Sequence, residues 1–160
     1  PLPSALSAQP HLPDPAADPG VVAYSPGPGG SPRIPVTLGG HDFLAVLDTA
    51  AERALILDES YLERLAIDGE LVAGPMIMTP GMGRLETKEG RVAGELVAGS
   101  ARLRSPPALF HRMREPEVLL GGGFLRGYVL TLDQANRRLR LAEPPAPEAE
   151  PADAGEPGGG

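Results

Sequence analysis

The sequence predicts a mostly β fold. Short apolar runs recur along residues 34–142, and turn signals rich in glycine or proline separate them at intervals of about 8–12 residues, as in a sandwich or small barrel. Some of these runs alternate apolar and polar residues, which is typical of strands with one buried face. Only the segment near residue 60 places its apolar residues at helical spacing. We therefore expect a β architecture with one or two short helices.

The first predicted element of this architecture is a hairpin. Residues 34–38 and 43–47 are apolar runs joined by Gly39-Gly40, and a glycine pair between two such runs predicts two antiparallel strands with a tight turn. Pro35 lacks a backbone donor, so it marks the first strand as an edge strand or as the start of a strand.

The later elements are a buried strand, one helix and a series of short strands. Residues 55–57 are too few for a helix and predict a strand. Over residues 58–65, an N-cap at Asp58 or Ser60 and helical apolar spacing predict a short helix. The remaining predictions are strands at 76–78, 85–87, 91–97, 101–103, 108–110 and 118–121, a helical turn at 122–125, and a hairpin of 128–133 with 137–141.

Glycine and proline divide the chain into one globular body and two tails. The chain has 21 Gly and 20 Pro among its 160 residues. Most of the prolines lie in residues 1–33 and 143–160, which contain too few apolar residues to form a core. We therefore expect a disordered Pro/Gly/Ala-rich tail over 1–33, one domain of ordinary size over 34–142, and a disordered acidic Pro/Gly-rich tail over 143–160.

Charge and composition exclude several classes of partner and site. The formal net charge of −7 comes mostly from the C-terminal tail, and the body is almost neutral. Proteins that bind nucleic acid or an anionic membrane surface present a basic face, so we expect neither partner. No apolar run approaches the roughly 18 residues of a membrane-spanning helix. Because the chain has no cysteine, disulfides, thiolate zinc sites and a cysteine nucleophile are excluded.

The N-terminus carries a weak signal about location. The chain begins at Pro1 in a stretch rich in Pro, Ala and Ser, without an initiator methionine. One interpretation is that a signal peptide has been removed, which predicts a periplasmic or secreted protein. The alternative is an ordinary expression boundary, which leaves the location open.

Asp48 is the first residue with a chemical signal. It ends an apolar strand and is followed by Thr49, Ala50 and Ala51. Burying a carboxylate there costs several kcal/mol unless a partner pairs with it or it stays protonated. However, Asp-Thr after a strand is also a common cap or Asx-turn. The motif alone is compatible with a catalytic group and with a simple turn.

Later motifs, in a fixed order, favour the catalytic interpretation. Asp48-Thr49-Ala50-Ala51 is followed by the glycine turn Gly81-Met82-Gly83, then by Leu119-Leu120-Gly121, and then by a strand that ends in Asp133 before a basic hairpin. Over residues 34–141 this set resembles the retropepsin-like aspartic proteases, the single-domain relatives of pepsin. The resemblance implies a closed or orthogonal β-barrel of the retropepsin type.

The resemblance further implies an aspartic endopeptidase with Asp48 as its catalytic residue. Hydrolysis by water needs one group that takes a proton and another that donates one, and two adjacent carboxylates do both because they cannot both ionise. No other aspartate of the chain repeats the Asp-Thr motif. The active form is therefore expected to be a homodimer with one Asp48 per subunit, acting on peptides or proteins without a metal or cofactor.

Other roles follow from the family by position. Thr49 matches the residue whose hydroxyl locks the two active-site loops together across the dimer, and Ala50 and Ala51 complete the loop. Residues 119–121 match the apolar segment that supports this loop. Residues 81–83 match the tip of a flap that covers the substrate. The alternative for the tip is a plain hairpin turn with nearby methionines as core residues, namely Met76, Met78 and Met82.

Two departures from the family pattern lead to a second hypothesis. Ala50 stands where the family has Gly, and an alanine forced to adopt φ > 0 costs about 1 kcal/mol and displaces Asp48. Gly122 and Gly123 stand where relatives often have larger residues, which alters packing beneath the site. The alternative function is a catalytically inactive retropepsin-like module that dimerises or binds an extended peptide. Zinc- and serine-hydrolase motifs do not occur in the sequence.

Overall fold

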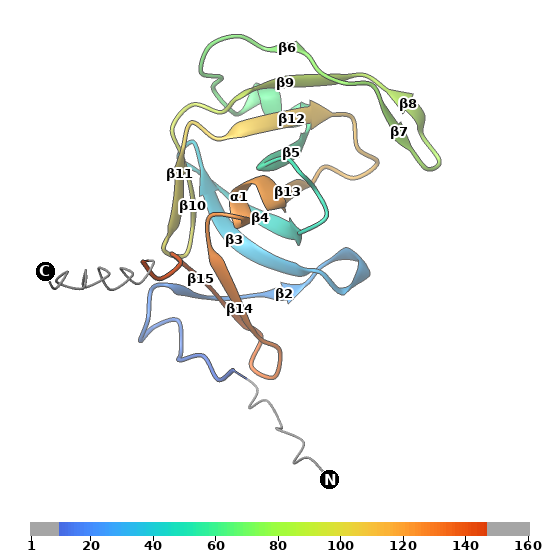
Figure 1. The fold of residues 1–160 in the computed structure, drawn as a ribbon. Helices are drawn as coiled ribbons and strands as arrows, with labels where there is room; N and C mark the ends of the chain where they lie inside the picture. Colours follow the sequence, from blue (N-terminus) through green and yellow to red (C-terminus); the bar gives the residue numbers. More distant parts are fainter. Residues whose placement is uncertain (1–9, 147–160) are drawn as a thin grey trace, which may run out of the picture.

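The structure, a computed structural model, describes residues 10–146. It is mostly β, with one α-helix, α1 (Gly122–Leu125), and two 3₁₀ segments, η1 (Pro28–Gly30) and η2 (Glu59–Glu63) (Figure 1). No described helix is long and apolar enough to cross a membrane. The strands are β1 (Val21–Ala23), β2 (Ser25–Pro26), β3 (Pro32–Leu38), β4 (His41–Asp48), β5 (Leu55–Asp58), β6 (Val72–Ala73), β7 (Ile77–Thr79), β8 (Gly83–Leu85), β9 (Thr87–Arg91), β10 (Glu95–Ala98), β11 (Ala101–Arg104), β12 (Pro107–His111), β13 (Val118–Gly121), β14 (Val129–Asp133) and β15 (Arg138–Ala142).

The largest sheet places β13 between β4 and β5. Its strands follow the order β11-β10-β3-β4-β13-β5-β12-β9-β6, and β2 pairs with β3. β13 runs parallel to β4, with Gly121 opposite Asp48, and antiparallel to β5, with Leu120 opposite Leu55. A strand from late in the sequence thus separates two consecutive ones. The end of β4 and the start of α1 therefore lie next to each other.

The predicted hairpin of β3 and β4 is confirmed. Gly39 and Gly40 have φ values of 56° and 83°, and two successive residues with positive φ are the requirement of the turn that glycine pairs favour. Pro35 lies opposite Leu44 of β4. On the other side of β3, β2 pairs with its start and β10 with its end, and neither of these two strands pairs with Pro35.

The core consists of apolar side chains from alternate positions of the strands. Ile34, Val36 and Leu38 of β3 are buried, as expected for a strand with one inward face. Leu139 and Leu141 of β15 belong to the same buried cluster, so the C-terminal hairpin packs on the main core. The largest fully buried side chains of the other strands include Leu55, Leu57, Leu96, Phe110 and Leu120.

Some predicted elements differ in detail from the observed ones. The segment 91–97 is not one strand, because the chain turns at Gly94, whose φ is 89°, between β9 and β10. The helix expected over 58–65 is the 3₁₀ segment η2. The main sheet ends at β11 and β6, and these two strands do not pair within the described residues. Closure into a barrel is therefore not confirmed.

The N-terminal boundary of the domain also differs from the predicted one. Residues 1–33 are predicted to be a disordered tail, whereas β1 and β2 lie within this range. β1 pairs antiparallel with β15, and Val21 is buried. Composition describes the average of a segment, and it does not detect three apolar residues that pair with a strand far away in sequence. Residues 1–9 and 147–160 of the predicted tails lie outside the described residues.

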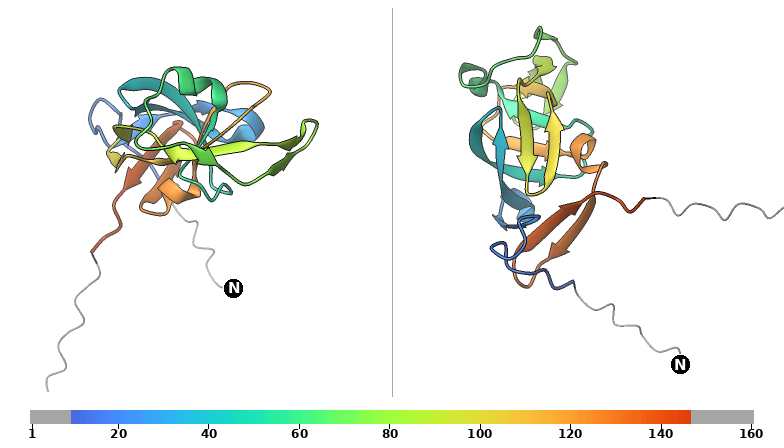
Figure 2. Two further views of the ribbon diagram at one scale, coloured as in Figure 1. Left: turned by 90° about the horizontal axis from the view of Figure 1, so that it is seen from above. Right: turned by 90° about the vertical axis from the view of Figure 1, so that its left-hand side faces the viewer.

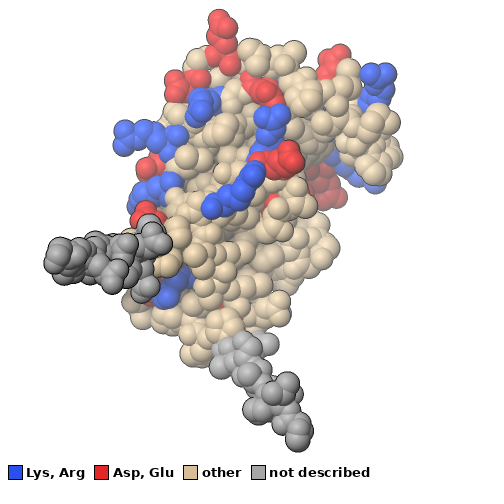
Figure 3. All heavy atoms as spheres, viewed as in Figure 1, with Lys and Arg blue, Asp and Glu red and all other residues tan. Residues whose placement is uncertain are grey.

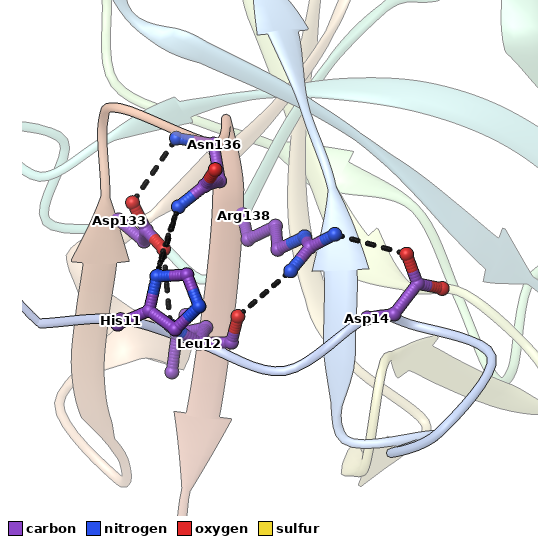
Figure 4. A network of polar contacts seen from close by, with 6 residues as sticks. All are labelled: His11, Leu12, Asp14, Asp133, Asn136 and Arg138. Carbon is purple, nitrogen blue, oxygen red and sulfur yellow. Dashed lines mark hydrogen bonds and ion pairs between the residues drawn. The ribbon is translucent and has the colours of Figure 1, made fainter.

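The residues before β1 are tied to the hairpin of β14 and β15, and we call residues 10–20 the N-terminal strap (Figure 4). Asp133 is only 2% exposed, and its carboxylate accepts hydrogen bonds from the backbone N–H of Leu12 at 3.0 Å and the side-chain amide of Asn136 at 2.8 Å. Arg138 donates to the carbonyl of Leu12 and to the carboxylate of Asp14, both at 2.9 Å. These polar contacts hold the strap across the hairpin.

The charge of Asp133 makes this attachment depend on pH. The side-chain hydrogen bond from Asn136 lowers the pKa of Asp133; burial opposes this shift, and the backbone donors and His11 reinforce it. A carboxyl group whose pKa is lowered by folding stabilises the folded state above its unfolded pKa of about 3.9, and this contribution disappears as the pH falls through the lowered folded value. We therefore expect the strap to stay attached at mildly acidic pH and to detach in stronger acid.

The backbone amide NMR resonances of Leu12 and Asn136 measure this attachment. In the wild-type chain, the chemical shifts of both amides are expected to change together, and only below about pH 4. Asp133→Asn removes the charge that these donors share, so its Leu12 resonance is expected at the detached position throughout. Asp42→Asn, which removes an exposed carboxylate outside the strap, is the matched control and is expected to keep the acid transition. A wild-type strap that stays attached in strong acid would contradict the assignment.

Candidate active site

Asp48 is the last residue of β4 and lies beside the end of β13. Residues 44, 46 and 48 of this strand share one face because side chains alternate along a strand. Asp48 is half-buried, and Thr49 and Ala50 after it are exposed. The carboxylate thus lies at the end of a central strand, next to exposed loop residues, where a second molecule can reach it.

The loop after Asp48 fixes the orientation of its carboxylate. Oδ1 accepts a hydrogen bond from the backbone N–H of Ala50 at 3.1 Å, and the backbone carbonyl of Asp48 accepts one from the N–H of Ala51 at 3.2 Å. This is an Asx-turn, so the simple turn that the sequence allows is present. No hydrogen bond within residues 10–146 uses Oδ2. The turn orients the carboxylate and leaves its second oxygen for an external partner.

Ala50 is not strained in this turn. Among the described residues other than glycine, only Ser105 and Arg137 have positive φ. The concern that an alanine here must adopt φ > 0 is therefore wrong for this chain, and no backbone penalty displaces Asp48. The methyl group of Ala50 lies on the exposed side of the loop.

Three consecutive glycines allow the chain that follows β13 to lie directly against the loop after Asp48. Gly121, Gly122 and Gly123 donate backbone hydrogen bonds to the carbonyls of Ala54, Ala51 and Arg53, at 3.0, 2.6 and 3.2 Å. A Cβ on Gly121 would lie 2.2 Å from the Arg53 carbonyl oxygen, and one on Gly123 would lie 2.6 Å from the Ala54 nitrogen. The larger residues expected in relatives do not fit here, because backbone packs against backbone.

Residues 81–83 form the tip of a hairpin that projects from the body. β7 and β8 pair only with each other in the described structure, and the left view of Figure 2 shows their hairpin extending beyond the rest of the domain. Gly81 and Gly83 have φ values of 78° and 77°, which glycine adopts readily. Met76 and Met78 are 53% and 73% exposed and Met82 is half-buried, so none of the three is a core residue. The hairpin makes no hydrogen bond with the Asp48 loop within the described residues, so its role as a flap stays a prediction.

Comparison with known proteins gives the family. A family described as aspartyl protease matches residues 34–124, more than half of the chain. The chain belongs to the aspartyl protease family. The matched residues include Asp48, the β7–β8 hairpin and the three glycines after β13. A comparison with curated proteins gives no match.

Solved structures of other aspartic proteases share the retropepsin-like fold of this chain. A retropepsin-like aspartic protease from Rickettsia conorii superposes with a TM-score of 0.55 and 15% identity, over 76% of this chain and 87% of that one. The EIAV protease in complex with the inhibitor HBY-793 superposes with a TM-score of 0.50 and 22% identity, over 64% of this chain and 91% of that one.

The base of the β7–β8 hairpin is held by a residue that the sequence does not single out. Thr87 is buried, its hydroxyl donates to the carbonyl of Pro75 at 2.7 Å, and its carbonyl accepts from the N–H of Gly74 at 2.9 Å. A Cβ on Gly74 would lie 2.4 Å from the Thr87 hydroxyl. In this aspartyl protease, the base of the β7–β8 hairpin is therefore fixed by Thr87.

A charged cavity lies beside residues 52–54, which follow the Asp48 loop. It has a volume of about 490 Å³, and its lining includes Glu52, Arg53 and Glu89. Arg53 and Glu89 form a direct ion pair at 2.5 Å, which ties the loop to β9. Nothing in the sequence pattern pairs these two residues. Within the part of the chain that the structure describes, no three acidic or histidine side chains gather as a metal site would require.

Proposed function

We propose that this chain is an aspartic endopeptidase whose active site forms between two copies, each contributing Asp48. The observation that carries the proposal is the position of Asp48. Its carboxylate is oriented by the Ala50 N–H at the end of a central strand, and its other oxygen has no partner among the described residues. Membership of the aspartyl protease family supports the same function.

The proposed chemistry needs two carboxylates that share one proton. The ionised Asp48 takes a proton from water, whose oxygen attacks the peptide carbonyl carbon, while the protonated Asp48 of the second copy donates its proton to the carbonyl oxygen. The tetrahedral intermediate then collapses, the C–N bond breaks, and the leaving nitrogen takes up the proton that the first Asp48 removed from water. Two carboxyl groups a few ångströms apart titrate as a pair, so one of them stays protonated where the other is ionised.

The proposal assigns the remaining residues by their position. Thr49 is exposed next to Asp48, where it can contact the loop of a second copy. Leu119, Leu120 and Gly121 hold the loop from behind through the ladder of β13 with β4. Residues 81–83 are the hairpin tip that covers an extended peptide.

The open edge of β14 supports pairing with a second copy. In the sheet of order β1-β15-β14, β1 covers one edge of β15, so β14 is the free edge. Val129 and Leu130 on this strand are 46% and 37% exposed. Figure 3 shows that the lower part of the face, where β14 lies, carries few charged side chains. An uncharged strand edge with exposed apolar residues favours pairing with another strand.

Cleavage of an unstructured peptide at mildly acidic pH tests this function. If two copies share the active site, the cleavage rate per chain is expected to rise with protein concentration and to follow the dimer fraction measured by sedimentation. A pepstatin-type inhibitor is expected to stop cleavage. A rate per chain that does not depend on concentration would overturn the shared site. A dimer that binds peptides without cleaving them would instead support the inactive module.

A further inference from the structure

Asp58 lies at the narrow base of the loop between β12 and β13. As the last residue of β5, it pairs with His111, where β12 ends, and the residue before it, Leu57, pairs with Val118, where β13 begins. Residues 112–117 leave and re-enter the sheet on either side of this position. Asp58 is nevertheless a carboxylate only 5% exposed.

The carboxylate of Asp58 joins this loop to η2. Oδ1 accepts hydrogen bonds from the N–H of Ser60 at 3.0 Å and from its hydroxyl at 2.5 Å, and Oδ2 accepts one from the N–H of Met113 at 2.7 Å. The backbone N–H of Asp58 donates to the carbonyl of Glu117 at 3.2 Å. One residue therefore holds both ends of the 112–117 loop.

Asp58 keeps its charge in this place. Burial raises the pKa of Asp58, but the hydrogen bonds from Ser60 and Met113 outweigh burial and lower the pKa overall, with a further contribution from His111. A charged acceptor forms stronger hydrogen bonds than a neutral one. The 112–117 loop is thus anchored by an ionised group even at mildly acidic pH.

The anchored loop reaches the tip of the β7–β8 hairpin. A Cβ on Gly81 would lie 3.3 Å from a terminal guanidinium nitrogen of Arg114. In Figure 1 the connection from β12 to β13 extends toward this hairpin. Because β7 and β8 pair only with each other in the described structure, the Arg114 side chain is a part of the chain outside the hairpin that comes close to its tip.

We propose that Asp58 is a positioning residue that places Arg114 against the tip of the hairpin, and that this contact holds the hairpin closed over a bound peptide. Asp58 touches neither the tip nor Asp48; it acts by setting the course of the 112–117 loop. This assignment rests on the peptidase function proposed above, because closure matters only if a peptide binds under the hairpin. The contact itself exists in the free chain.

Hydrogen exchange of the hairpin amides tests the contact without any need for activity. Arg114→Ala is expected to raise the exchange of residues 79–83 by about 5- to 10-fold, since a restraint on a locally opening segment is lost. Arg112→Ala removes another exposed arginine of the same loop and is the matched control, with hairpin exchange unchanged. Asp58→Asn puts an NH₂ group where the carboxylate accepts from N–H donors on both sides, so it is expected to raise exchange in both the loop and the hairpin.

Measurements of cleavage kinetics then distinguish a failure of the Arg114 contact from a failure of the proposed peptidase function. If the wild-type chain cleaves peptides, Arg114→Ala is expected to raise KM by about 5-fold and to change kcat by less than about 2-fold, because closure affects peptide retention more than the chemical step. An inactive wild type with faster hairpin exchange in Arg114→Ala would overturn the peptidase and keep the contact. Unchanged exchange in Arg114→Ala, or an equal rise in Arg112→Ala, would overturn the contact.

Discussion

Asp48→Asn is expected to lower peptide cleavage by about 10³-fold or more, because an amide can neither take up the proton of the attacking water nor return it. The substitution is nearly isosteric, and an amide oxygen still accepts the hydrogen bond from the Ala50 N–H that orients the turn. The fold and the dimer are therefore expected to survive. The initial rate of cleavage at mildly acidic pH, compared with the wild type at equal dimer fraction, measures the effect.

A mixing experiment controls this prediction. If subunits exchange freely, equal amounts of wild type and Asp48→Asn are expected to leave about a quarter of the dimers with two aspartates. The cleavage rate is then expected to fall to about a quarter of that of the same total amount of wild type, whereas without exchange about half would remain. Asp42→Asn, on the same strand but near its other end, is the matched variant, with cleavage unchanged. Equal cleavage by Asp48→Asn and wild type would show that another mechanism operates.

Gly121→Ala is expected to destabilise the domain by about 3 kcal/mol or more, which is a large part of the stability of a domain this size. The new methyl group would lie 2.2 Å from the carbonyl oxygen of Arg53 and about 3 Å from Ala51. Both contacts involve backbone, which cannot rotate away as a side chain does. Urea unfolding followed by circular dichroism measures the change.

Gly127→Ala is the matched control for this prediction. A Cβ on Gly127 would meet the carbonyl oxygen of Phe124 at 3.7 Å, which is an ordinary contact, and Gly127 is not among the residues with positive φ. The free energy of unfolding of the Gly127→Ala variant is expected to differ from that of the wild type by less than about 1 kcal/mol. A Gly121→Ala chain as stable as Gly127→Ala would mean that β13 does not pack against the loop as described.

Much of the fold follows from local sequence patterns, and its exceptions arise from long-range contacts. The β3–β4 hairpin is predictable because its signal, a glycine pair between two apolar runs, is contained in the segment itself. β1 is not predictable, because its three residues form a strand only against β15. Leu12 is likewise buried only in the folded chain, where its backbone N–H donates to the carboxylate of Asp133, 121 residues later.

Part of the candidate site can likewise be predicted from local sequence patterns, and part of it cannot. Asp48 and residues 119–121 are predictable because each carries a local motif, a carboxylate or a glycine at the end of an apolar strand. Asp58 and Thr87 carry no such motif, and in sequence Asp58 is only a possible N-cap. Their roles depend on Met113 and Pro75, whose backbone groups reach them only in the folded chain. Buried polar residues of this kind are recognised by their partners, which a single sequence does not show.

The separate sheet of β7 and β8 has a consequence for how heat affects this protein. Because its ladder is shared with no other described strand, the hairpin can open and close without breaking hydrogen bonds of the main sheet. Local opening and global unfolding therefore have separate free energies. If the hairpin covers a bound peptide as proposed, warming is expected to speed peptide binding and release well below the melting temperature, and a substitution that stabilises the core is expected to leave these rates unchanged.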